Sequence, residues 1–108
     1  MDNLLSVRLE AHRPDRNHHR FYELRIGRDF FGQWTLTICY GRIGQAGRER
    51  MFSSINPKAL RKQIQHCLNV RETAPRRVGC RYRLVNIEQA EGVLVQDWLP
   101  EAWLQPFL

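Results

Sequence analysis

Long apolar runs are missing from this sequence of 108 residues, in which no uninterrupted hydrophobic stretch exceeds a few residues. A membrane-spanning helix needs about 20 apolar residues, and a secretory signal needs a basic start before an apolar segment. The three cysteines, Cys39, Cys67 and Cys80, are an odd number spread far apart. They fit neither a disulfide framework nor the paired spacing of metal ligands. We therefore expect a cytoplasmic protein with one small domain, reduced cysteines, and no metal or cofactor.

Lysine is scarce, and the C-terminal part of the chain lacks basic residues altogether. Arg supplies 15 of the 17 basic side chains, all of which lie in residues 1–86 beside 7 acidic ones. Residues 87–108 hold 4 acidic residues, and the net charge of the whole chain is +6. Because Arg is suited to bidentate recognition of phosphate, one interpretation is a polyanionic partner such as a nucleic acid. The other is an Arg-rich genome that uses Arg on a merely solvated surface.

Alternation of apolar and polar residues predicts an antiparallel sheet, because a period of two is typical of half-buried strands. The segments with this pattern are residues 4–11, 20–26 and 34–40. We expect a further strand to resume over residues 48–53 after the glycines, and a last strand to return over residues 80–88. Residues 12–19, rich in His and Arg around Pro14, are expected to form an exposed connection. A short loop containing Gly32 joins two of the strands as a hairpin.

One segment has the period of a helix instead. Ser54 or Asn56 can cap it, and Pro57 suits the first helical position. Apolar residues then recur at helical spacing, at Leu60, Ile64, Cys67 and Leu68. The sequence therefore predicts an amphipathic helix over about 57–72 and an α+β fold, in which this helix packs on the small antiparallel sheet.

Residues 89–108 form a tail of different composition, in which apolar and acidic residues occur without a basic one. The tail is too apolar to be disordered. One alternative is that it folds back over the sheet of its own domain. The other is that Trp98, Trp103 and Phe107 dock a partner protein or a second copy of the chain, since large exposed apolar patches mark interfaces.

A glycine-rich segment follows the third predicted strand and reads Tyr40-Gly41-Arg42-Ile43-Gly44-Gln45-Ala46-Gly47. Its spacing matches neither the dinucleotide-binding fingerprint nor the P-loop. We expect Gly44 and Gly47 to supply positive φ angles in a turn. Tyr40 continues the apolar alternation and so fits either a core position or an exposed stacking position. Arg42 should point to the same side as Tyr40 unless the chain bulges at Gly41.

The order of these segments resembles the WGR domain. The resemblance rests on Phe21-Tyr22-Glu23-Leu24, Trp34-Thr35-Leu36, the glycine segment and Tyr82-Arg83-Leu84-Val85. It covers residues 18–88, which leaves an N-terminal strand and loop at 1–17 and the tail at 89–108. This family is named for a Trp-Gly-Arg triplet and occurs in DNA-dependent poly(ADP-ribose) polymerases and in short bacterial proteins.

The resemblance implies a nucleic-acid-binding module without a catalytic unit. In the polymerases the family Trp stacks on a nucleotide at a DNA break, and the family Arg contacts the nucleic-acid backbone. Tyr40 and Arg42 would take these roles here, although Tyr40 stands where the family has Trp. A tyrosine ring can still stack on a base or sugar, but with a smaller face.

The predicted nucleic-acid-binding residues combine this motif with nearby basic side chains that would neutralise phosphates. They are Tyr40, Gly41, Arg42, Arg48, Arg50, Lys58, Arg61, Lys62, Arg76 and Arg77. The local sequence indicates no catalytic set of residues.

We therefore predict a non-enzymatic recognition subunit that binds DNA rather than RNA, at ends or nicks, and that is associated with the nucleoid. The alternative is an adaptor whose basic sheet surface binds an acidic protein. A third interpretation is a regulator that senses a free nucleotide near Tyr40 and Arg42.

Overall fold

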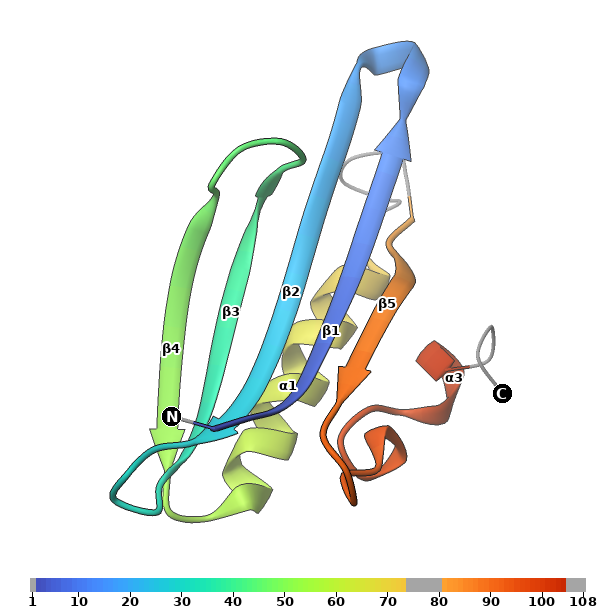
Figure 1. The fold of residues 1–108 in the computed structure, drawn as a ribbon. Helices are drawn as coiled ribbons and strands as arrows, with labels where there is room; N and C mark the ends of the chain where they lie inside the picture. The colour runs from blue at the N-terminus through green and yellow to red at the C-terminus, as the bar shows by residue number, and fades with distance from the viewer. Residues whose placement is uncertain (1, 74–80, 105–108) are drawn as a thin grey trace.

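The strands form one antiparallel sheet in the order β4-β3-β2-β1-β5 (Figure 1). The computed structural model describes residues 2–73 and 81–104. Its elements are β1 (Asp2–Arg13), η1 (Pro14–Arg16), β2 (His18–Arg28), β3 (Trp34–Arg42), β4 (Arg48–Ser54), α1 (Pro57–Glu72), β5 (Arg83–Gln89), η2 (Val95–Asp97) and α3 (Glu101–Leu104). This sheet with one main helix packed against it, in the described part of the chain, confirms the predicted α+β class.

Helix α1 has the predicted bounds, and local chemistry explains where it begins. The Asn56 side chain accepts a hydrogen bond from the backbone N–H of Lys58 at 2.9 Å, and Pro57 occupies the first turn. Leu60, Ile64 and the two residues one turn further on form its buried stripe. Each such side chain contributes about 1.5 to 3 kcal/mol when it leaves water. The helix runs diagonally across one face of the sheet, from the β4 end toward β5 (Figure 1).

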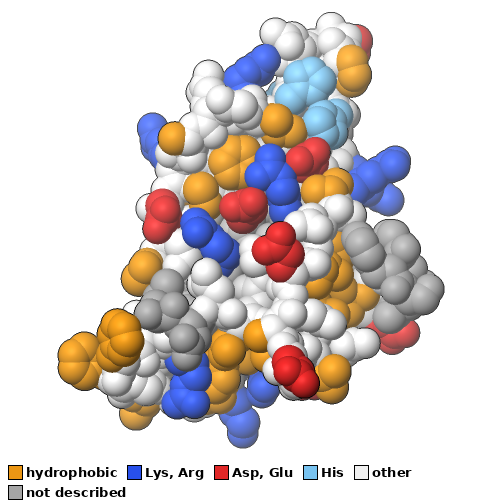
Figure 2. Space-filling model, viewed as in Figure 1, with side chains coloured by type: hydrophobic (Ala, Val, Ile, Leu, Met, Phe, Trp, Pro, Cys, Tyr) orange, Lys and Arg blue, Asp and Glu red, His pale blue; other side chains and the backbone are white. Residues whose placement is uncertain are grey.

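The two faces of the sheet differ in composition because side chains alternate along each strand. The face that packs on α1 carries the apolar core. Its buried strand residues include Leu5, Val7, Leu9, Leu24, Ile26, Leu36 and Ile38. The opposite face, here called the open face, carries no helix of the described residues and is the face seen in Figure 2.

The connection between β1 and β2 is shorter than predicted, because both strands extend into the segment expected to be a loop. His12 pairs with His19 and Arg13 pairs with His18, which leaves only residues 14–17 to make the turn. The Nδ1 atoms of His12 and His19 lie 2.8 Å apart, so the polar side chains pair across the strands. Strand pairs that extend beyond the core need no apolar residues. The search for apolar alternation therefore did not detect the outer part of the β1–β2 hairpin.

The C-terminal tail returns to the chain's own core. Val95, Trp98, Leu99, Trp103 and Leu104 are all buried there. The Trp98 ring lies 5.3 Å from the ring of Trp34, and the Arg61 guanidinium lies 4.9 Å from the Trp98 ring centre. This is the fold-back alternative, in which Trp98 and Trp103 pack into the core of their own domain. Phe107 lies outside the described residues.

Strand β5 begins at Arg83, three residues later than the predicted strand, and pairs with β1 rather than with a neighbour in sequence. The start of the predicted strand, Cys80, is not among the described residues. Where α1 ends, the Arg71 guanidinium lies 4.2 Å from the Tyr22 ring centre and 5.6 Å from that of Tyr82. These cation–π contacts connect the end of the helix to the sheet and to the residue that leads into β5.

Candidate nucleic-acid interface

Helix α1 leaves uncovered the ends of β3 and β4 that the glycine segment joins (Figure 1). The strand register and the alternation of side chains place four arginines near these ends, on the helix side of the sheet. The strand register places Arg42 opposite Arg20, and Arg48 opposite Tyr40. Arg50 is opposite Ile38, two residues further along β4 and therefore on the same face. All four guanidinium-bearing residues are exposed. We call Arg20, Arg42, Arg48 and Arg50 the arginine face.

The two faces of the sheet differ in how their arginines are paired. On the open face Arg8 pairs with Glu10 at 2.8 Å and with Glu23 at 3.0 Å, and Arg25 lies 3.8 Å from Glu49. Figure 2 shows acidic and basic side chains mixed across the middle of this face. No arginine of the arginine face forms an ion pair with any described residue. The helix side therefore carries a cluster of four unpaired arginines, whereas the open face carries a single unpaired one, Arg83, opposite Glu10 in the strand register of the described residues.

Tyr40 occupies the middle of the arginine face. It is half-buried and packs against the core, with its ring centre 6.1 Å from that of Tyr22. The sequence left open whether Tyr40 takes a core position or an exposed stacking position. Both apply in part, because one part of the ring is covered and another remains exposed. The exposed part lies beside the cross-strand Arg48 and two residues from Arg42.

Arg42 is held in place by the tip of the β1–β2 hairpin. Its Nη1 donates to the backbone oxygen of Asn17 at 2.9 Å, and its Nη2 donates to Asn17 Oδ1 at 3.1 Å. Asn17 can present both oxygens because it adopts a left-handed conformation with φ 51°, which Asn tolerates better than most residues. Donors of this guanidinium that do not contact Asn17 remain available to an anion.

The glycine segment brings β4 close to β3 at Tyr40. The register runs without a bulge from Tyr40 through Gly41 to Arg42, so Arg42 lies on the same side as Tyr40, as expected. Gly44 and Gly47 both have positive φ, which confirms the predicted turn. A Cβ atom at Gly47 would lie 2.5 Å from the Tyr40 carbonyl oxygen and 2.8 Å from the Phe21 ring, so no side chain fits there.

Phe21 supports the glycine segment from the open face. It is 5% exposed although that face carries no helix. The Arg8 guanidinium covers its ring at 4.7 Å from the centre, and the ring also lies near Gly41 and Gly47. The open face thus contributes the packing that fixes the backbone beneath Tyr40 and Arg42.

The basic surroundings also alter the titration of His18. The Arg20 Nε donates to His18 Nε2 at 2.7 Å. Partial burial, followed by the positive charges of Arg20 and Arg42, lowers the pKa of His18 below its ordinary value of 6.5. On the open face, hydrogen bonds from Arg8 and His12 lower the pKa of the Glu10 carboxyl.

Residues 5–72 match the model of the WGR domain, and this range covers more than half of the chain. The chain belongs to the WGR domain family. WGR domains are nucleic-acid-binding modules in general and are not themselves catalytic. The match begins within β1, whereas the resemblance in the sequence was placed from residue 18. No curated protein matches the chain.

The residues at the WGR triplet position were predicted as site residues, and the fold places them next to other predicted arginines. Tyr-Gly-Arg at residues 40–42 lies at the end of β3, with Arg48 and Arg50 on the neighbouring strand. These predicted residues are brought together by the fold.

The other predicted basic residues lie elsewhere. Lys58, Arg61 and Lys62 are exposed in the first half of α1, and Arg61 is occupied by its contact with Trp98. Arg76 and Arg77 lie outside the described residues. No helix in the described ranges is long and apolar enough to span a membrane.

Arg20 and His18 were missed among the predicted site residues. Arg20 is an even-numbered residue in the same alternation as Tyr22 and Leu24, so the pattern already assigned it to the helix side. What the pattern lacked was the β2–β3 register that places Arg20 opposite Arg42.

Proposed function

We propose that this WGR protein binds DNA through the arginine face, without catalysing a reaction. The observation that carries the proposal is that the four arginines of the arginine face form no ion pair with a described residue, whereas Arg8 and Arg25 on the open face do. Arginines that were needed only for solvation would be expected to pair with acids on either face. Here the ion pairs of Arg8 and Arg25 lie on the open face and that of Arg13 with Asp15 lies at the β1–β2 turn, so the arginine face is left to be neutralised by an external anion. A phosphate backbone is a polyanion with regularly spaced charges that Arg can bind bidentately.

Binding should be measured by fluorescence anisotropy with a labelled DNA duplex at low salt. Arg42→Gln removes one charge from the arginine face, and Arg25→Gln removes one from the open face as a matched control. We expect a loss of affinity of at least about tenfold for Arg42→Gln, because a charge-assisted hydrogen bond contributes about 1.5 to 3 kcal/mol. The Arg25→Gln variant should bind like the native chain. Equal losses in the two variants would contradict the proposal.

We further propose that Tyr40 stacks on a terminal nucleotide, so that ends or nicks bind more tightly than continuous duplex. Support comes from its half-exposed ring between Arg42 and Arg48, since aromatic stacking contributes about 1 to 3 kcal/mol per base. The test compares blunt, nicked and circular DNA in Tyr40→Phe and Tyr40→Leu variants. A preference for ends should persist in Tyr40→Phe and disappear in Tyr40→Leu. A preference retained by the Leu variant would exclude stacking by this residue.

A protein-binding adaptor is the second candidate, and a different feature favours it. Phe30 and Phe31 are 92% and 90% exposed at the tip of the β2–β3 hairpin. The turn is held by two hydrogen bonds, in which Asp29 Oδ1 accepts the backbone N–H groups of Phe31 and Gln33, each at 2.9 Å. Two phenyl rings held in solvent on an ordered turn are suited to insertion into an apolar pocket of a partner.

The two functions respond differently to salt and to mutation. A partner bound through the hairpin tip should be lost in a Phe30→Ser/Phe31→Ser double variant and retained in Arg42→Gln, with little dependence on salt. DNA binding should show the opposite pattern. A partner that still binds the double variant would exclude the hairpin tip as the docking element.

A further inference from the structure

A cavity of about 720 Å³ lies at the β5 edge of the sheet, between the end of α1, the start of β5 and α3. Its volume is within the range of about 300 to 1,000 Å³ that is typical of small-molecule sites. It lies at the sheet edge opposite β4, so it is separate from the arginine face. Apart from Glu72, its lining residues follow the segment that matches the WGR domain.

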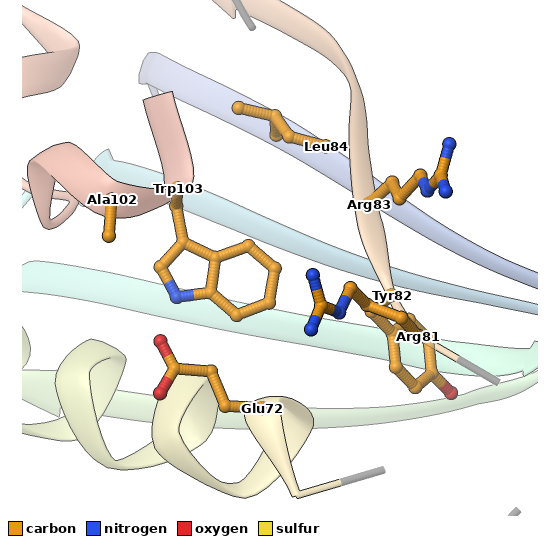
Figure 3. A pocket seen from close by; sticks show the side chains of 7 residues that line it. All are labelled: Glu72, Arg81, Tyr82, Arg83, Leu84, Ala102 and Trp103. Carbon is orange, nitrogen blue, oxygen red and sulfur yellow. The ribbon is translucent and has the colours of Figure 1, made fainter. Parts of the chain in front are cut away.

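An unpaired donor lines this cavity. Trp103 is 9% exposed, and its Nε1 atom is buried without a hydrogen-bond partner among the described residues. Figure 3 shows this nitrogen on the side of the ring that faces the Glu72 carboxylate. Buried indole N–H groups normally have an acceptor, so the unpaired donor points to a ligand that supplies one.

Two charged groups beside the indole also lack partners. Neither Glu72 nor Arg81 forms an ion pair or a side-chain hydrogen bond with a described residue. Figure 3 shows the Arg81 guanidinium directed into the space between Trp103 and Tyr82. The apolar side chain of Leu84 lies further along β5 in the same lining. A donor, a carboxylate and a cation thus converge on one space with aromatic and aliphatic walls.

We propose that this cavity binds a guanine nucleotide, either free or as one unit of a nucleic-acid strand. The Watson–Crick edge of guanine places the O6 acceptor beside the N1–H and N2–H donors. Trp103 Nε1 would donate to O6, and the two Glu72 oxygens would accept from N1–H and N2–H. Arg81 would pair with the phosphate, and the ring of Tyr82 would cover one face of the base.

The same groups disfavour the other bases. The Watson–Crick edge of adenine offers one donor group, N6–H₂, beside the N1 acceptor, so one Glu72 oxygen would be left without a partner. Cytosine offers the same single-donor pattern on a smaller ring. A site built to satisfy polar groups rejects ligands that leave those groups unpaired. This inference is independent of DNA binding by the arginine face.

Titration calorimetry on the full chain with GMP, AMP, CMP and inorganic phosphate tests the proposal. We expect GMP to bind at least tenfold more tightly than AMP or CMP, and Trp103→Phe to weaken GMP binding at least tenfold. Glu72→Gln should shift the preference toward AMP, because an amide presents one donor and one acceptor. Binding that does not distinguish GMP from AMP, or that survives both substitutions, would overturn the proposal.

Matched controls separate the pocket from general damage. Trp98→Phe and Glu101→Gln change the same residue types outside the cavity lining and should leave GMP binding unchanged, with circular dichroism confirming that every variant is folded. The Arg42→Gln variant should also bind GMP normally. A failure of the guanine-site proposal can therefore be distinguished from a failure of the proposal that the arginine face binds DNA.

The pentanucleotides d(TTGTT) and d(TTATT) distinguish the two sources of guanine. If GMP binds and the Glu72→Gln substitution abolishes this binding, the ligand is the free nucleotide. If only d(TTGTT) binds, and again depends on Glu72, the ligand is a guanine within a strand. Glu72-independent binding of both oligonucleotides, without any GMP binding, would contradict a guanine site.

Discussion

Arg20 and Arg42 lie directly opposite each other in the β2–β3 ladder and point to the same side of the sheet. Like charges in this position destabilise a sheet. Each guanidinium is turned to a neutral partner, since Arg20 donates to His18 and Arg42 donates to Asn17. An anion that bound both arginines would replace this repulsion by attraction.

The pairing predicts opposite effects on stability and on binding. Arg20→Thr removes the cross-strand repulsion and should raise the free energy of unfolding by about 0.2 to 1 kcal/mol. The same substitution should weaken DNA binding by about tenfold, because it removes a phosphate contact. Urea denaturation and anisotropy measure the two effects. Arg8→Thr is the control and should lower stability while leaving binding unchanged, because Arg8 pairs with Glu10 and Glu23.

Gly47 is predicted to be far less replaceable than Gly44. Both have positive φ, so Ala at either position costs about 1 to 2 kcal/mol in backbone conformation alone. Gly44 has nothing within 4 Å of an added Cβ, whereas at Gly47 the Tyr40 carbonyl oxygen would lie 2.5 Å away. Gly47→Ala should therefore lower the free energy of unfolding by clearly more than Gly44→Ala does in urea denaturation. Equal losses would mean that the close approach of the strands is not needed.

DNA binding should take up a proton at His18. Partial burial and the charges of Arg20 and Arg42 lower the pKa of His18 in the free protein below 6.5. A bound phosphate would neutralise those charges and raise the pKa again, so affinity should increase as pH falls through 6.5. Anisotropy between pH 5.5 and 7.5 measures this slope, and His18→Asn should flatten it. A slope that is unchanged in His18→Asn would assign the proton to another group.

The Glu10 cluster predicts a loss of stability in acid. Hydrogen bonds from Arg8 and then His12 lower the folded-state pKa of Glu10 below its ordinary value of 4.5. A lowered pKa stabilises the folded state above 4.5, and the gain is lost as pH falls through the folded value. Glu10→Gln should therefore be less stable than the native chain at neutral pH, and the difference should vanish in acid. Thermal melting at pH 7 and at pH 2.5 tests this.

Local signals in the sequence were sufficient for α1 and for most strands. The Asn56-Pro57 start and the spacing of Leu60 and Ile64 depend only on neighbouring residues, and the helix has its predicted bounds. The alternation through Trp34 and Leu36 likewise predicted β3. The extended β1–β2 hairpin was missed, because its outer pairs are polar and lie beyond the core.

Features that depend on distant pairing could be predicted only in part. Tyr40 and Arg42 were found through the glycine segment, but Arg20 joins them only through the strand register. The tail's composition left two alternatives open, and the fold-back onto the core is visible only through a distant contact, the packing of Trp98 on Trp34. The cavity beside Trp103 depends on the return of that tail to the end of α1, so no local pattern could have indicated it.

The salt dependence of DNA binding tests the arginine face most directly. The logarithm of the binding constant should fall linearly with the logarithm of salt concentration, with a slope of about −0.9 per neutralised phosphate. Replacing Arg42 and Arg48 together by Gln should make the slope shallower by about 1.8, whereas replacing Arg8 and Arg25 should leave it unchanged. Equal slopes in both double variants, or a loss confined to the open-face pair, would contradict the account.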